Sequence, residues 1–191
     1  MKSIVSLNTA LAQALVTPQG TVASGIRKQP RAGPVAVRPL GLDSDEQADL
    51  TVHGGLSKAV YAYPSEHYAF WQGVRVQAKV AGGDQTLPPG SMGENLTLSG
   101  LLEAEVFIGD LLRFANGCEL AVSEPRYPCF KFNAVMGFNQ ASKLMVQTGW
   151  CGMYLAVRKP GTLSAGEAFE LIPGPREVGI VELFKARMRK T

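Results

Sequence analysis

One cysteine, Cys129, lies in a proline-rich segment that is flanked by basic residues. Pro125 and Pro128 bias this segment away from helix, because proline fixes its own φ angle and restricts the residue before it. A thiol held in a stiff turn near Arg126 and Lys131 should ionise more readily than free cysteine, whose pKa is about 8.5. Because the thiolate is both a nucleophile and a soft metal ligand, Cys129 is the first candidate for function. The alternative is an inert cysteine that packs as a small hydrophobic residue.

Two other segments carry residues that are suited to binding. His53-Gly54-Gly55 precedes Lys58, and two glycines let backbone amides approach an anion that a lysine can neutralise. Gly93-Glu94-Asn95 supplies a carboxylate and an amide, which offer donors and acceptors to the edge of a heterocycle such as a purine or a pterin. The common glycine-rich nucleotide motifs are absent. A nucleophilic dyad of His53 and Cys129 is conceivable, but nothing in the sequence supports it specifically.

The other cysteines and acids do not form a recognisable metal motif. Cys118, Cys129 and Cys151 are widely spaced and lack a C-x-x-C pair, which argues against a disulfide framework and against a zinc or iron–sulfur cluster. Three unpaired cysteines predict a reducing, cytoplasmic location. The acidic segment 43–49 lacks the spacing and the glycine of an EF-hand, so we interpret it as solvated or as a partner for nearby Arg or Lys.

Composition bounds the class of protein. The chain has 191 residues, of which 46% are hydrophobic and 18% charged, which is typical of a globular protein of one domain spanning residues 1–191. The net charge of +3, from 19 basic and 16 acidic residues, is too small to predict a nucleic-acid partner. No apolar run approaches the roughly 18 residues of a membrane-spanning helix, so we expect no membrane partner either.

Most segments have the alternation and β-branched content of short strands, interrupted by Gly and Pro turns. We expect a mainly β fold with small helices (α+β), either a β-barrel or a strongly bent sheet. A short helix should begin at Ser65 and end at Gly73, and others should span 130–137 and 140–146, the last closed by Gly149. The expected strands span residues 2–7, 21–27, 34–37, 58–63, 93–98, 105–108, 110–114, 118–123, 150–158, 168–172 and 179–184.

Taken together, these motifs resemble those of the MOSC family, named for the C-terminal domain of molybdenum cofactor sulfurases. The likeness is greatest to the stand-alone bacterial hydroxylaminopurine-resistance proteins, and the motif core covers about 24–173. Ser57 departs from the family pattern, in which many relatives have an acidic residue there. The matching stretches, in the family's order, are residues 41–49, 52–55, 58–68, 93–97, 108–110 and 125–131.

The resemblance implies a MOSC-type mixed β-barrel that binds molybdenum cofactor, a pterin dithiolene with a terminal phosphate. Cys129 matches the family's cysteine, which implies that it is the catalytic residue and ligates molybdenum as a soft thiolate. The residues implied to bind the phosphate and pterin are His53, Gly54, Gly55, Lys58, Tyr61, Asn95, Arg126 and Lys131.

The resemblance further implies an oxidoreductase that reduces N-hydroxylated compounds, such as N-hydroxylated bases, with electrons from a separate redox protein. One alternative is a sulfur carrier that receives sulfur from a desulfurase as a Cys129 persulfide. Another is a non-catalytic module that binds the cofactor.

Overall fold

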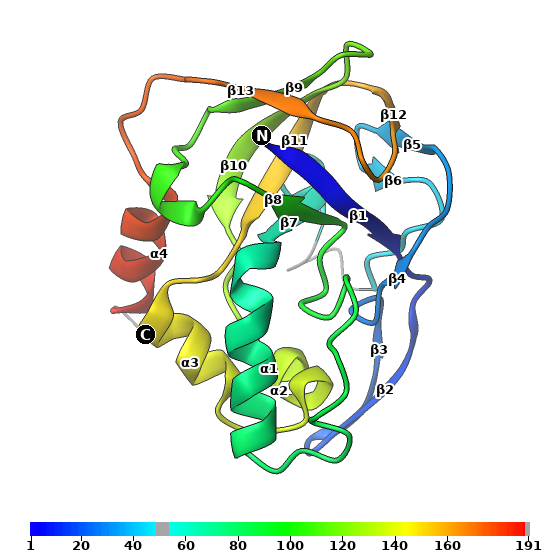
Figure 1. Cartoon of the computed structure of the whole chain (residues 1–191), viewed down its shortest axis with the longest axis vertical. Coiled ribbons are helices and arrows are strands. Elements are labelled where there is room, and N and C mark those ends of the chain that lie inside the picture. Colours follow the sequence, from blue (N-terminus) through cyan, green and yellow to red (C-terminus); the bar gives the residue numbers. More distant parts are fainter. Residues whose placement is uncertain (49–53, 190–191) are drawn as a thin grey trace.

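A bent, mixed sheet of eight strands dominates the computed structural model, which describes residues 1–48 and 54–189 (Figure 1). Every described pair of neighbours in it is antiparallel except β7 and β8, which run parallel. In spatial order the strands are β13 (Phe169–Ile172), β9 (Leu111–Phe114), β10 (Glu119–Pro125), β11 (Met153–Lys159), β7 (Val60–Pro64), β8 (Leu96–Ser99), β1 (Ser3–Thr9) and β4 (Gln29–Pro30).

The bend brings the first strand of the chain to the segment that leads into the last. Ser3 forms an isolated antiparallel bridge with Ala168, and the Ile4 amide donates to the Glu167 carbonyl at 2.9 Å. This contact approaches the predicted barrel, but among the described residues the sheet does not close into one continuous ladder. The prediction of a mainly β fold with small helices is confirmed.

Smaller elements surround this sheet. In Figure 1 the first three helices gather at one end of it, and α4 lies at its side. The hairpin of β2 (Gln13–Thr17) and β3 (Gly20–Ser24) packs against α2. The remaining elements are the three-stranded sheet β12 (Gly161–Leu163), β5 (Val35–Arg38) and β6 (Gly41–Leu42); the helices α1 (Tyr68–Gln77), α2 (Phe130–Met136), α3 (Ala141–Thr148) and α4 (Ile180–Met188); and the 3-10 turns η1 (Leu56–Lys58), η2 (Ser65–His67) and η3 (Glu103–Glu105).

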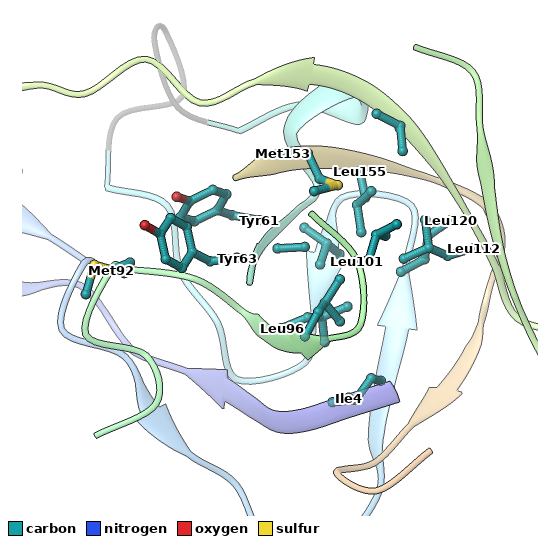
Figure 2. Close-up of a cluster of buried hydrophobic side chains, with 14 of the residues drawn as sticks. Ile4, Tyr61, Tyr63, Met92, Leu96, Leu101, Leu112, Leu120, Met153 and Leu155 are labelled. Carbon is teal, nitrogen blue, oxygen red and sulfur yellow. The ribbon is translucent and has the colours of Figure 1, made fainter. Parts of the chain in front are cut away.

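The core fills the concave side of the bent sheet. Figure 2 shows Met153 and leucines from several strands packed together, with Tyr61 and Tyr63 side by side and directed away from Leu112 and Leu120. Alternation along β7, which lies in the predicted strand 58–63 and extends one residue past it, places both tyrosines on one face of the strand. The tyrosine rings therefore pack against the hydrophobic core, while their hydroxyls donate to the carbonyls of Cys151 and Trp150.

Some local predictions are wrong. Of the predicted strand 179–184, residues 180–184 belong to helix α4. Ile180 and Phe184 are buried at the four-residue spacing of a helix, which a six-residue window does not separate from a strand. Ser65 makes no capping hydrogen bond, and α1 continues past Gly73 to Gln77. An added Cβ at Gly73 would meet nothing within 4 Å, so this glycine only lowers helix propensity.

Two further strand predictions differ from the structure. The segment 105–108 contains the end of η3 rather than a strand, and the hairpin strand β2 was not predicted. The prediction that Gly149 closes the helix after residue 140 is confirmed, because Gly149 caps α3 in the left-handed conformation. No helix in the described part of the chain combines the length and the apolar character needed to cross a membrane.

Candidate functional site

A cavity opens where the turn after β10 meets η1, β7 and the loops before β4 and β8. It encloses about 620 Å³ of empty space, part of which is open solvent at its mouth. Segments far apart in the sequence therefore share one wall. The lining residues are Ser24, Gly25, Ile26, Lys28, Asp45, Glu46, Gln47, Ala48, Gly54, Lys58, Tyr61, Gly93, Asn95, Arg126, Cys129, Lys131 and Tyr154.

The structure brings most of the predicted site residues together around this cavity. Gly55 does not line it but directly precedes η1, with a positive φ of 83°. His53 lies outside the described residues, so its predicted role stays a prediction. The predicted residues that line the cavity are Gly54, Lys58, Tyr61, Asn95, Arg126, Cys129 and Lys131.

Cys129 is the last extended residue before α2, and its side chain is half-buried at the cavity. Its backbone is fixed by two hydrogen bonds to its carbonyl oxygen. The Phe132 amide donates to it at 2.9 Å from α2, and the Ser142 hydroxyl donates at 3.1 Å from α3. Two helices thus fix the backbone of Cys129, in addition to the prolines that predict a stiff turn.

Arg126 is the most unusual charge in the cavity. It is only 5% exposed, and its guanidinium carbon lies 5.1 Å from the ring centre of Tyr61 and 5.0 Å from that of Phe132. Such cation–π contacts favour the charged form but leave the N–H groups at the edge of the plane unsatisfied. Nη1 is buried and has no hydrogen-bond partner among the residues that the structure describes. A buried donor of this kind is costly unless an acceptor reaches it.

Two tyrosines form an aromatic wall beside Arg126. The ring centres of Tyr61 and Tyr154 lie 5.4 Å apart, and burial raises the pKa of both phenols. Both hydroxyls are therefore neutral near pH 7. The Tyr61 hydroxyl donates to the Cys151 carbonyl at 2.9 Å, which fixes the ring that faces Arg126.

Lys58 enters the cavity from η1, which is tied to β10. Its amide donates to the Gly55 carbonyl at 3.0 Å, and its Nζ lies 3.8 Å from an oxygen of Glu124. The Ser57 hydroxyl donates to the other Glu124 oxygen at 3.1 Å, and the Ser123 hydroxyl donates to the Ser57 carbonyl. The serine that departs from the family pattern therefore joins the two segments that carry Lys58 and Arg126.

A buried ion pair that was not predicted lies among the lining residues. Asp45 Oδ1 accepts from Lys28 Nζ at 2.5 Å and from the Ala10 amide at 2.9 Å, and Oδ2 accepts from Asn95 Nδ2 at 2.9 Å. The side chain of Asp45 is only 2% exposed and that of Lys28 only 7%. The acidic segment is thus partly a buried partner for lysine, one of the two interpretations that its sequence allows.

The side-chain amide of Asn95 makes three hydrogen bonds within the protein. Its Oδ1 accepts from the Tyr61 amide at 3.0 Å, while Nδ2 donates to the Asn8 carbonyl at 3.2 Å and to Asp45. Both of its N–H groups are therefore engaged. Asn95 shapes the cavity wall, and direct donation from its side chain to a ligand would require one of these bonds to break.

The neighbouring carboxylate of Glu94 does not lie in the cavity lining. It is fully buried and accepts hydrogen bonds from the Tyr68 and Thr97 hydroxyls and from the amides of Gly90 and Met92. Burial raises its pKa, although these donors oppose the shift. Glu94 holds the loop before β8 in shape, so the suggestion that it reads a heterocycle edge is wrong.

The residue between Arg126 and Pro128 faces away from the cavity. The Tyr127 ring stacks on Phe184 of α4, with ring centres 5.8 Å apart, and the Arg187 guanidinium carbon lies 4.7 Å from its ring centre. The adjacent residues Arg126 and Tyr127 thus contact the cavity and α4, respectively.

No group of three or more His, Cys, Asp or Glu side chains in the described ranges is placed to hold a metal ion. Within those ranges, Cys129 therefore does not belong to a preformed protein metal site. Lys28, Asp45 and Tyr154 were missed because each is brought to the cavity by long-range pairing. Only Asp45 had a signal in the sequence, as part of the matching stretch 41–49.

A model of the MOSC domain matches residues 49–170, and the chain belongs to this family. It is 36% identical over 170 residues to the protein named Uncharacterized protein YflK of Bacillus subtilis (strain 168), across 89% of this chain and 73% of that one. It is 34% identical over 156 residues to a protein named Reductase of Gibberella moniliformis (strain M3125 / FGSC 7600), across 82% of this chain but only 27% of that one.

A solved structure supports the same assignment. YiiM from Geobacillus stearothermophilus superposes with a TM-score of 0.77 at 29% identity, covering 100% of this chain and 85% of that one. The resemblance seen in the sequence motifs is thereby confirmed at the level of the family.

Proposed function

We propose that this MOSC protein is an oxidoreductase that binds molybdenum cofactor with Cys129 as a metal ligand and reduces N-hydroxylated compounds, such as N-hydroxylated bases. The observation that carries the proposal is the buried Nη1 of Arg126, which has no hydrogen-bond partner among the described residues and lies in the cavity that Cys129 also lines. A family relative named Reductase supports the class of reaction.

The residues present fit such a group. A thiolate is an apt ligand for a soft metal, and Cys129 is half-buried at the cavity rather than sealed in the core. Lys58, Arg126 and Lys131 supply positive charge for a phosphate, and Arg126 offers planar N–H donors where Lys offers a point charge. The free cysteines agree with the predicted reducing location.

The bound cofactor would supply the oxygen-atom transfer that no side chain of the cavity provides. The protein would hold and orient it. Cys129 would fix the metal, and Arg126 and Lys58 would neutralise the phosphate, with Lys131 and the glycine turn at 54–55 beside them. The neutral rings of Tyr61 and Tyr154 would exclude water from one side. Electrons would come from a separate redox protein.

The test is molybdenum and pterin content, together with reductase activity, of protein purified from a host that makes the cofactor. We expect stoichiometric molybdenum and turnover of 6-hydroxylaminopurine with reduced viologen, and loss of both in Cys129→Ser. Arg113→Gln is the control substitution and should keep both molybdenum and activity, because this exposed arginine pairs with Glu119 and does not line the cavity.

Full metal content and full activity in Cys129→Ser would overturn the proposal. Cyanide-labile sulfur on Cys129 in protein without molybdenum would favour the sulfur carrier. Bound pterin without turnover under any reductant would favour the non-catalytic module.

A further inference from the structure

Lys28 has unused hydrogen-bonding capacity inside the cavity. The residue is 8% exposed and lines the cavity from the loop before β4. An ammonium group has three N–H donors, and in the part of the chain that the structure describes Nζ has one partner, Asp45 Oδ1. Two donors of a nearly buried lysine are thus left for whatever occupies the cavity.

The residues beneath Lys28 hold it in place. Asp45 is anchored by the Ala10 amide and by Asn95, and Asn95 is itself held by β1 and β7. Because both N–H groups of Asn95 are engaged, Asn95 has no free donor for a ligand and supports Lys28 through Asp45. The position of Lys28 is therefore fixed before any ligand arrives.

Lys28 and Arg126 differ in whether a described carboxylate compensates their charge. Asp45 neutralises Lys28 at 2.5 Å, whereas Arg126 forms no ion pair with a described carboxylate. An anionic group gains most at Arg126, where the positive charge is uncompensated. The pair of Lys28 and Asp45 instead suits a neutral acceptor, since an added negative charge would lie against the buried carboxylate.

We propose that Lys28 is a ligand-binding residue that donates to a neutral acceptor, a carbonyl oxygen or ring nitrogen on the edge of a heterocycle. This inference deepens the proposed function and rests on it for the role of the cavity as a cofactor or substrate site. It moves heterocycle recognition from Glu94 and Asn95 to Lys28. The same chemistry is offered by the pterin ring of the cofactor and by a purine base, so the test has one arm for each.

The test measures binding to the full-length protein without cofactor. Neopterin is followed by its own fluorescence, and 6-hydroxylaminopurine by calorimetry. We expect Lys28→Met to weaken binding of at least one probe by about tenfold or more, the loss typical of a hydrogen bond from a charged group. The exposed Lys143→Met on α3 is the matched control and should bind as the wild type does. The probe that depends on Lys28 identifies the source of the heterocycle.

Lys28→Met leaves Asp45 buried without its partner, so a variant that also carries Asp45→Asn removes both charges together. Thermal melting verifies that each variant is folded. Wild-type affinity for both probes in a folded variant without Lys28 would overturn the inference, as would failure of the wild type to bind either probe. Molybdenum content is measured separately, so that Lys28-dependent binding in a protein that never acquires molybdenum would overturn only the proposed function.

Discussion

Replacing Asn95 by alanine should destabilise the fold before it weakens any ligand contact. The side chain of Asn95 satisfies the Tyr61 amide of β7, the Asn8 carbonyl of β1 and Asp45 Oδ2. Asn95→Ala leaves all three without this partner. Because β7 and β1 both flank β8, the substitution would loosen the middle of the main sheet rather than its edge.

The size of the effect follows from the number of groups left unsatisfied. A buried donor or acceptor that loses its partner costs about 1–3 kcal/mol. Asp45 keeps Lys28 and the Ala10 amide as donors, so we count only the two backbone groups of Tyr61 and Asn8. The free energy of unfolding should therefore fall by about 2–6 kcal/mol, a large part of the 5–15 kcal/mol typical of a domain.

Urea unfolding followed by circular dichroism measures this loss. With an m-value near 3 kcal/mol/M, the midpoint should fall by about 0.7–2 M. Asn95→Asp keeps the size of the side chain but removes both N–H donors and adds a second carboxylate beside Asp45, so it should also destabilise. The exposed turn residue Asn139→Ala is the control and should change stability by less than about 0.5 kcal/mol. A shift in Asn95→Ala as small as that of the control would refute this reasoning.

Three further predictions concern the surroundings of the cavity. Gly152→Ala should cost about 2–5 kcal/mol in thermal melts, because φ is +65° and the new Cβ would lie 2.5 Å from the Ala62 carbonyl oxygen; a neutral result would contradict the close approach. Iodoacetamide should label the half-buried Cys129 before Cys118, since burial raises the pKa of Cys118 to about 11; peptide mass spectrometry would count against this order if both were labelled equally. Burial raises the pKa of Glu94, so its contribution to stability is fully present below the unfolded value of about 4.3 and is lost as pH rises through the folded value; urea midpoints from about pH 4 upward should decline less steeply in Glu94→Gln.

The sequence predicted those parts of the site whose signal is local. The stiff turn around Cys129 follows from Pro125 and Pro128, and alternation along β7 places Tyr61 and Tyr63 on one face. The predicted strands 110–114 and 118–123 correspond to β9 and β10, which pair antiparallel across Asn116-Gly117, a dipeptide typical of hairpin turns.

The rest depended on contacts that no local pattern contains. Lys28 comes from a turn and Tyr154 from the middle of a strand, and each reaches the cavity only because the main sheet bends. The role of Glu94 was predicted wrongly because the sequence does not show whether its carboxylate faces a ligand or, as in the structure, four donors of the protein. Segment 179–184 was too short for its periodicity to distinguish helix from strand.

The position of Tyr127 between the cavity turn and α4 has a mechanical consequence. Helix α4 contributes no residue to the cavity lining, yet its Phe184 and Arg187 contact the Tyr127 ring. Tyr127 is one residue from Arg126 and two from Cys129 in the sequence. A displacement of α4 would therefore move the backbone that carries Arg126 and Cys129. In the reverse direction, a ligand that moved Arg126 would displace Tyr127 and, through it, α4. Contacts made on the outer surface of α4 would therefore affect the position of the Cys129 thiol.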